Sequence, residues 1–245
     1  MAARTYKTEA IVLRSLRFSE ADRILHLYTH DRGRIGAIAK GIRKTKSRFG
    51  ARLEPLSHVE LVLHEGSGEL QTVTGVSLIA SHHETRESPY RLGAALIGAE
   101  AMLRLFGEPE ANPRAFAALA RFLELLDEVA PVEGRPALDP LALSFQLKLL
   151  WLSGYLPHVT ACVECGAGEL VGFSARAGGA VCREHTAGAF SVSPDGLAGI
   201  EQLLSVPLAD AGAAGLGDRA RREALAVVTS CYEEHGGFRL RSVSG

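Results

Sequence analysis

The chain has 245 residues, of which 47% are hydrophobic and 22% are charged, and its formal net charge at pH 7 is −1. These values are typical of a soluble globular protein, and no apolar run reaches the length of a bilayer span, which argues against a membrane protein. No apolar run of a signal peptide follows Arg4 and Lys7, so a cytoplasmic location is expected.

The near-neutral total hides an uneven distribution of charge. Residues 1–80 hold 13 Lys or Arg against 8 Asp or Glu, a net charge of +5. Residues 81–245 hold the other 14 and 20, a net charge of −6. The N-terminal part is therefore the one expected to meet an anionic partner.

Residues 1–80 have the pattern of a small all-β domain. Apolar and β-branched residues recur in short runs, and turn residues at 30–33 and 66–68 separate some of them. The predicted strands cover residues 10–16, 23–28, 34–39, 58–63 and 70–79. Five short strands in this length predict a small barrel or sandwich, and a five-stranded OB-type β-barrel is the natural candidate.

Beyond residue 82 the apolar residues recur at helical spacing. The predicted helices cover residues 92–106, a segment that begins at 112–113, residues 139–151, 194–204 and 218–235. The third of them is apolar nearly all round, which predicts burial on several sides. Residues 209–217 are rich in Ala and Gly and are expected to form a loop, and Cys231 is expected to be a buried thiol on the last helix.

A run of basic residues lies between the third and fourth predicted strands. Five cations fall within residues 40–48, with no acid among them, and Arg52 follows. Such a run on a small β-barrel is typical of a surface that binds the phosphates of a nucleic acid without reading sequence. The predicted DNA-contacting residues are Arg14, Arg34, Lys40, Arg43, Lys44, Lys46, Arg48 and Arg52.

Two further features leave alternatives open. Phe49 and Tyr28 either stack on bases or occupy core and turn positions. Arg219, Arg221 and Arg222 open the last predicted helix, where cations are disfavoured by the helix dipole. They form either a second phosphate contact or a solvated face.

Three cysteines and a histidine have the spacing of a closed zinc site. They read Cys162-x2-Cys165-x16-Cys182-x2-His185, with glycines around them that suit tight turns. Three thiolates and one imidazole complete a tetrahedron around Zn²⁺, which then has a structural role because no coordination position stays open.

Two other interpretations of these residues involve a catalytic zinc ion. The segment His82-His83-Glu84 lies upstream of the Cys162 pair and bears some likeness to a zinc deaminase signature. Its spacing is wrong, however, and Ala161 replaces the expected proline, so His82 and His83 are expected to be solvated residues of a connecting segment. A catalytic zinc site would also keep a water ligand, which four local protein ligands exclude.

Several ordered segments resemble bacterial recombination mediators of the RecO family, and the resemblance spans essentially the whole chain. The N-terminal segments are 9–14, 19–23, 33–35, 40–48 and 53–56, and the C-terminal ones are 154–157, the Cys162 pair with Gly166, Cys182 and 240–242. The chain departs from the family at the metal site, because His185 stands where the family is expected to carry a fourth cysteine.

The resemblance implies an α+β multidomain architecture. Its parts are an OB-fold DNA-binding domain at 1–80, a helical domain at 81–157 and 189–245, and a zinc-binding module at 158–188 inserted into the helical domain. It also implies a non-enzymatic, nucleoid-associated DNA repair protein. Such a protein binds single- and double-stranded DNA, anneals complementary strands, and assists recombinase loading on strands coated with single-stranded DNA-binding protein.

The implied protein partners are RecR, single-stranded DNA-binding protein and, as a further candidate, the recombinase RecA. A second hypothesis is a protein-interaction scaffold that zinc stabilises and whose DNA affinity is incidental. Weak DNA binding that is insensitive to changes in the basic run would favour the scaffold.

Overall fold

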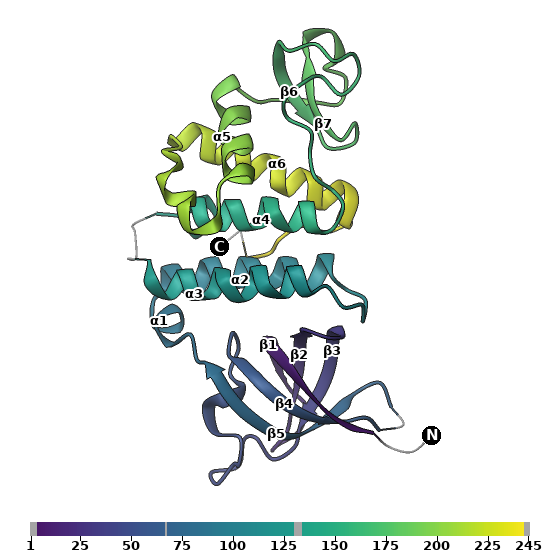
Figure 1. The fold of residues 1–245 in the computed structure, drawn as a ribbon, viewed down its shortest axis with the longest axis vertical. Helices are drawn as coiled ribbons and strands as arrows, with labels where there is room; N and C mark the ends of the chain where they lie inside the picture. Colours follow the sequence, from purple (N-terminus) through teal and green to yellow (C-terminus); the bar gives the residue numbers. More distant parts are fainter. Residues whose placement is uncertain (1–3, 67, 130–133, 243–245) are drawn as a thin grey trace. The chain divides into compact units, whose positions relative to one another are not determined.

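The chain folds into two compact units. The computed structural model describes residues 4–66, 68–129 and 134–242 (Figure 1). One unit comprises Met1–Glu87 and Phe106–Val129 and is called the barrel unit below. The other comprises Ser88–Leu105 and Ala130–Gly245 and is called the helical unit.

A closed five-stranded barrel forms the N-terminal part, as predicted, with the strand order β1-β2-β3-β5-β4. Side chains alternate between the two faces of each strand, so that Leu25 and Leu27 of β2 enter the core together with Leu61 and Leu63 of β4. The strands are β1 (Thr5–Arg17), β2 (Arg23–Thr29), β3 (Gly33–Ala39), β4 (His58–His64) and β5 (Gln71–Ala80). The period-2 pattern of the sequence therefore places the buried face correctly.

The barrel closes through a short parallel seam. Strands β3 and β5 pair at Ala37↔Gln71 and Ile38↔Thr72, whereas β4 and β5 pair along most of their length. The short helix η1 (Gly50–Leu53) contacts β5, and Arg52 donates to the carbonyl of Val76 on that strand at 3.2 Å. The segment between β3 and β4 also contributes Ile42, Phe49 and Leu53 to the core. The core is thus completed by the same segment that carries the basic run.

Helices α1 (His83–Glu87) and α3 (Pro113–Glu128) belong to the barrel unit. As predicted, α3 begins behind an N-cap: the side chain of Asn112 accepts from the backbone N–H of Ala115, and Pro113 occupies the first turn. The ring of Phe116 meets the rings of His30 and His58 edge-on, with centroids 5.5 and 5.6 Å apart. These contacts hold α3 against the barrel strands.

The solvated position expected for His82 is wrong. Its side chain is 1% exposed, and its Nδ1 lies 2.7 Å from a carboxylate oxygen of Asp127 on α3. The other oxygen of Asp127 accepts from the backbone N–H and the hydroxyl of Thr85 on α1. A buried imidazole needs a polar partner, and this one comes from 45 residues away, where sequence pattern gives no sign of it. His83 is exposed.

The helical unit is built around α4 (Pro140–Leu152), which packs against α2 (Pro89–Leu105), α5 (Pro194–Ser205) and α6 (Asp218–Gly236). Its predicted burial on several sides is confirmed. Asp139 caps its N-terminus by accepting from the backbone N–H groups of Leu141 and Ala142. Ser144 and Lys148 donate to the last carbonyls of α5, those of Leu203 and Leu204, which satisfies acceptors that a helix end leaves unpaired.

Two local features complete this unit. Residues Leu208–Ala214, expected as part of a loop, form the 3-10 helix η4, because Leu208 and Ala211 fall on one face at a three-residue period and both are buried. Cys231 is buried as expected, and burial raises the pKa of its thiol to about 12. Among the described residues, no helix has the length and apolar character needed to cross a bilayer.

Asp127 provides a test of the barrel unit. We expect Asp127→Ala to lower the free energy of unfolding by about 2 kcal/mol, since it leaves the ring of His82 and the N–H of Thr85 without their acceptor. Urea denaturation followed by circular dichroism measures this change. The matched control is Glu128→Ala, at the exposed neighbouring position, which should change stability little. Equal midpoints for both variants would contradict the role given to Asp127.

Candidate metal centre and nucleic-acid interface

The Cys162, Cys165, Cys182 and His185 side chains converge on one point in the helical unit, as their spacing predicts. Their ligand atoms all lie within 4.8 Å of one another. The Sγ atoms of Cys165 and Cys182 are 3.8 Å apart, and Nδ1 of His185 lies 3.3 Å from Sγ of Cys182 and 3.7 Å from Sγ of Cys162. A tetrahedral zinc ion with Zn–S bonds of about 2.3 Å has sulfur–sulfur edges of about 3.8 Å. The four donors therefore fit Zn²⁺.

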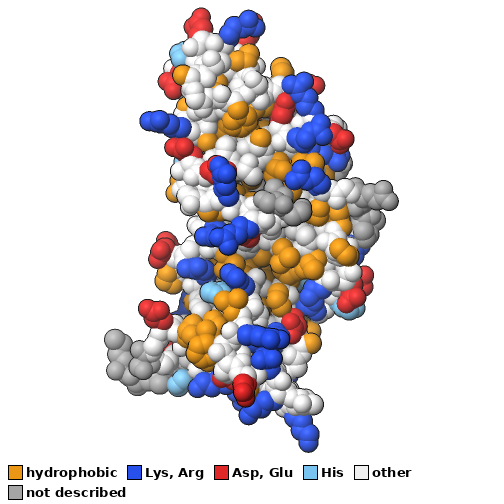
Figure 2. Space-filling view, turned by 180° about the vertical axis from the view of Figure 1, so that it is seen from behind, with side chains coloured by type: hydrophobic (Ala, Val, Ile, Leu, Met, Phe, Trp, Pro, Cys, Tyr) orange, Lys and Arg blue, Asp and Glu red, His pale blue; other side chains and the backbone are white. Residues whose placement is uncertain are grey.

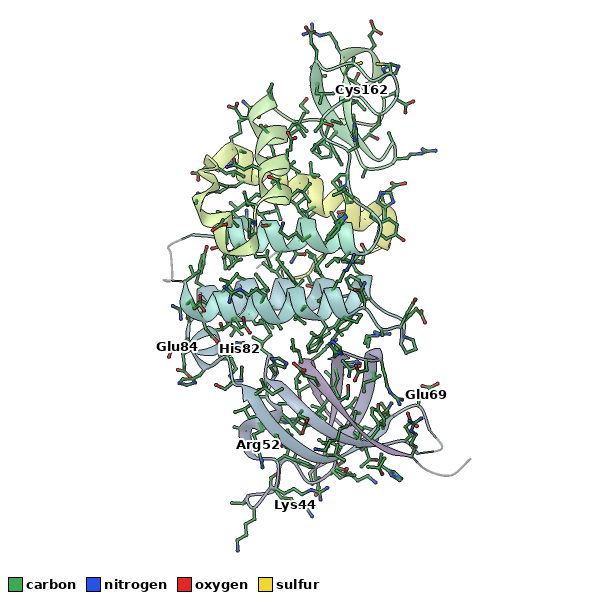
Figure 3. The ribbon with its side chains drawn as sticks, viewed as in Figure 1. Lys44, Arg52, Glu69, His82, Glu84 and Cys162 are labelled. Carbon is green, nitrogen blue, oxygen red and sulfur yellow. The ribbon has the colours of Figure 1, made fainter. Side chains whose placement is uncertain are left out.

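Short elements hold these ligands. In the first pair, the carbonyl of Cys162 accepts from the N–H of Gly166, whose positive φ of 76° closes the turn. Cys182 ends β7 (Gly179–Cys182) and His185 lies in the 3-10 helix η3 (Arg183–His185). Strand β7 pairs with β6 (Leu170–Ser174), which also pairs with β8 (Phe190–Ser191). The label of Cys162 in Figure 3 marks this metal module.

Backbone donors around Cys162 favour its thiolate. Burial opposes the charge, but the N–H groups of Cys182, Glu164 and Cys165 outweigh it and lower the pKa of Cys162 to about 6. A thiolate is the form that binds zinc. Four protein donors fill the tetrahedron, so the set suits a structural ion and gives no support to zinc catalysis. His82 and Glu84 are not part of this cluster.

The basic run forms a chain of turns between β3 and η1 in the barrel unit. Its two apolar residues, Ile42 and Phe49, are buried in the barrel core, and the cations between and beside them point outward. The exposed cations are Lys40, Arg43, Lys44, Lys46 and Arg48. None of them forms an ion pair within the part of the chain that the structure describes. Figure 3 shows Lys44 directed away from the strands, and Figure 2 shows Lys and Arg side chains at this end of the barrel unit.

Backbone contacts fix the path of this run. The guanidinium of Arg43 donates to the carbonyls of Ser19 and Glu20, and its N–H donates to the carbonyl of Ala21. The carboxylate of Asp22 accepts from the N–H of Gly41 at 2.7 Å. The run is therefore attached to the turn between β1 and β2, which presents its charges on a defined surface.

Arg52 differs from the other predicted contacts. Its guanidinium donates to the carbonyls of Phe49, Val76 and Arg48. These bonds connect the basic run to β5 and use donors that a phosphate would otherwise take. A structural role is evident for Arg52, and its predicted DNA contact stays a prediction.

Arg14 and Arg34 lie on the outer face of the barrel rather than on the basic run. Arg14 is opposite His26 across β1 and β2, and His26 is opposite Gly36 across β2 and β3. Burial, followed by the charges of Arg34 and Arg14, lowers the pKa of His26. Sequence reasoning did not select His26, although strand alternation places it on the face opposite Leu25 and Leu27.

Phe49 and Tyr28, which the sequence left as either base-stacking or core residues, are both buried. Phe49 is 1% exposed and Tyr28 is fully buried, so neither offers a ring to a base. The ring of Phe106 covers Tyr28 edge-on, with centroids 6.0 Å apart. Burial raises the pKa of Tyr28 to about 12.

Two of the three arginines at the start of α6 form contacts close to them in sequence. Arg219 pairs with Glu223 one turn later at 2.9 Å, and Arg221 donates to the carbonyl of Leu216. Arg222 is exposed. The positions of the first two favour the solvated-face alternative.

Comparison with known families agrees with the geometry of both units. Residues 1–82 match the family described as "Recombination protein O N terminal", and residues 86–244 match "Recombination protein O C terminal". The chain belongs to the RecO family. It is 40% identical over 225 residues to a DNA repair protein RecO of Rubrobacter xylanophilus, which covers 89% of this chain and 88% of that protein.

Other RecO proteins match at similar levels. The DNA repair protein RecO of Frankia casuarinae is 40% identical over 238 residues, covering 94% of this chain and 93% of its own length. That of Heliobacterium modesticaldum is 35% identical over 251 residues, covering 98% and 89%. The predicted family is thereby confirmed, and this RecO protein is a DNA repair and recombination protein.

The metal centre makes a direct test possible. We expect this RecO protein to retain about one zinc ion per chain on purification. The Cys162→Ala variant should lose the ion. It should also be cleaved faster by protease between residues 158 and 188, because metal binding supplies folding energy to such modules. Elemental analysis and limited proteolysis measure the two effects. Cys231→Ala is the matched control, because it removes the thiol outside the cluster and should keep the ion. Equal metal content in Cys162→Ala and the parent would contradict the assignment.

Proposed function

We propose that this RecO protein binds single- and double-stranded DNA through its barrel unit without sequence specificity and anneals complementary strands. The observation that carries the proposal is the set of five exposed cations, free of acidic partners among the described residues, on a segment anchored in the barrel core. The names of the related proteins, DNA repair protein RecO, support a nucleic-acid partner.

Counterion release accounts for the affinity. Each phosphate that a Lys or Arg neutralises frees condensed cations, so binding weakens steeply as salt rises. The hydroxyls of Thr45 and Ser47 lie among the cations and add donors for phosphate oxygens. Since phosphates are the same in every sequence, this surface has no means of reading bases.

Annealing follows from the same charges. Two single strands repel each other through their phosphates, and a surface that neutralises both lowers the cost of bringing them together. Lys44, Lys46 and their neighbours are held by buried Ile42 and Phe49, so the charges stay concentrated in one place. Bases that are not clamped by the protein are then free to pair. No covalent step is involved, which is why we propose a non-enzymatic role.

We further propose that this protein assists recombinase loading on strands coated with single-stranded DNA-binding protein. The proposed partners are RecR, single-stranded DNA-binding protein and, as a further candidate, RecA. This part of the proposal rests on family membership. The Cys3His cluster is proposed to hold a structural Zn²⁺ that stabilises the metal module.

One observation favours the scaffold as a second candidate. The helical unit exposes large apolar side chains on and after α4: Trp151 is 53% exposed, Leu156 48% and Tyr155 41%. Exposed aromatic residues are frequent at protein interfaces. Partner capture without any effect of the basic run on DNA binding would favour this alternative.

Charge reversal in the basic run tests the DNA surface. For the triple variant Arg43→Glu, Lys44→Glu, Lys46→Glu, we expect weaker binding to single-stranded DNA and a slope of log K against log salt that is shallower by about 2, because about three phosphate contacts are lost. Fluorescence anisotropy over a salt titration measures both quantities. The double variant Lys44→Glu, Lys46→Glu should show the same direction while it spares the backbone contacts of Arg43.

The matched control reverses three exposed cations elsewhere, Arg114→Glu, Arg176→Glu and Arg183→Glu, with the same change in net charge. It should keep the parent's salt slope. An equal loss of affinity in the control would mean that net charge, and not this surface, determines binding.

Annealing is tested with two complementary oligonucleotides, bare or coated with single-stranded DNA-binding protein. We expect the parent to accelerate duplex formation under both conditions and the triple variant to lose the acceleration, since it no longer neutralises both strands. Quenching of a strand-borne fluorophore follows the reaction. Absence of acceleration by the parent would contradict the proposed annealing activity and would favour the hypothesis of a protein-interaction scaffold.

A further inference from the structure

The three cysteines of the metal module differ in their access to solvent. Cys162 is 3% exposed and Cys182 is 6% exposed, whereas Cys165 is exposed. Nothing lies within 4 Å of a Cβ built at Gly166 or at Gly168, so no neighbouring group covers the turn that follows Cys165. The ligand cluster is therefore open to solvent on the side of Cys165 and closed around the other two cysteines.

Cys165 and Cys182 lie close enough to form a bond once no ion separates them. Their Sγ atoms are 3.8 Å apart, which is the edge of a tetrahedron around zinc. A disulfide bond is about 2.05 Å long, so the sulfurs need to approach by less than about 2 Å. Cys182 is held in β7 opposite Leu170 of β6, whereas Cys165 lies in a turn without strand pairing. The turn can therefore carry Cys165 to Cys182 while the sheet stays in place.

Exposure decides which sulfur meets an oxidant first. Cysteine binds zinc as the thiolate, so all three sulfurs of the loaded site share that form. Oxidation of cysteine follows thiolate character and solvent access. Because the thiolate character is common to the three ligands, solvent access singles out Cys165.

The site has no reserve of ligands if two thiolates are lost. A bond between Cys165 and Cys182 leaves only Cys162 and His185, whereas a structural zinc site uses four protein ligands. The buried apolar cluster of the module consists of Val181 and two of the cysteines, which is too small to hold the fold. Loss of the ion therefore removes the folding energy of the module.

We propose that Cys165 is a redox modification site, at which a hydroperoxide starts the conversion of Cys165 and Cys182 to a disulfide with release of zinc. The Cys165 sulfur attacks one oxygen of hydrogen peroxide, the O–O bond breaks, and the departing hydroxide takes up a proton to give water. The Cys182 thiolate then attacks the sulfenic sulfur of Cys165. The S–S bond forms and the second oxygen leaves as water after it takes up a proton. The two sulfurs are oxidised by two electrons, and one peroxide is reduced to two waters.

The inference rests on the structural zinc ion proposed above and is independent of the proposed DNA binding. All four cysteines of the chain belong to the helical unit, so the barrel unit has no thiol for an oxidant to modify. Oxidation therefore opens the metal module and leaves the basic run unchanged. The oxidised protein keeps its DNA surface while it loses an ordered part of its helical unit.

The test treats the purified full-length protein, loaded with zinc, with a molar excess of hydrogen peroxide. A chromogenic zinc chelator measures the release of the ion, and mass spectrometry of a digest locates the disulfide. We expect complete loss of the ion, a disulfide between Cys165 and Cys182, and faster protease cleavage between residues 158 and 188. Dithiothreitol with added Zn²⁺ should restore the ion and the protease resistance, because a disulfide is reversible.

Two variants place the effect at the exposed thiol. Cys165→His keeps a fourth zinc ligand but has no sulfur to oxidise, so it should hold the ion and lose its release by peroxide. Cys231→Ala is the matched control, because it removes a thiol outside the cluster and should release zinc as the parent does. If Cys165→His does not retain zinc, the position of the disulfide in the parent decides the question.

The outcomes separate this inference from the proposed zinc site and from the proposed DNA surface. Zinc that stays bound to the parent under peroxide, or release with a disulfide that includes Cys162, would overturn the inference. A parent that carries no zinc before treatment would instead contradict the zinc site itself. Fluorescence anisotropy with single-stranded DNA should give the treated parent its original affinity and salt slope. A weaker affinity would contradict the confinement of the oxidation to the helical unit.

Discussion

The incomplete seam between β3 and β5 is the constraint on which the barrel unit depends. Parallel pairing at Ala37↔Gln71 and Ile38↔Thr72 leaves the rest of β5 without a second strand partner among the described residues. Unpaired strand edges and exposed apolar core residues are costly. The segment from Ile42 to Leu53 meets both needs, since it inserts apolar side chains into the core and bonds to the carbonyl of Val76. Its hydrophilic residues have no place to lie except on the surface.

This constraint explains how clustered cations are held together. An isolated basic loop would spread, because like charges repel. Here burial of Ile42 and Phe49 and the bonds of Arg43 and Gly41 to the first hairpin turn oppose the repulsion. The energy of the core thus maintains a concentrated positive charge, and a polyanion relieves the repulsion when it binds.

The metal module solves a different problem in the helical unit. Its buried apolar cluster consists of Cys162, Val181 and Cys182. A cluster of this size is too small to stabilise a fold on its own. Four ligands around one ion would replace the missing core, and His185 in place of the expected fourth cysteine keeps the donor set complete. The module needs no open coordination site for this purpose, which agrees with a protein whose proposed activity is binding.

Local sequence patterns were enough to predict the five strands, most of the helices and the Cys3His cluster, because these follow from short-range rules: side-chain period, caps such as Asn112 and Asp139, and paired ligand spacing. The basic run was also visible in the sequence. The side chains that meet across long separations are instead set by the packing of the folded chain. Asp127 draws His82 into the interior, Phe106 covers Tyr28, and Val76 takes the guanidinium of Arg52. His26, Gly36 and Leu70 come from three segments of the barrel unit and form a pocket only when those segments are brought together. Such contacts depend on strand register and on how a distant segment crosses the sheet, and no local pattern of residues records either.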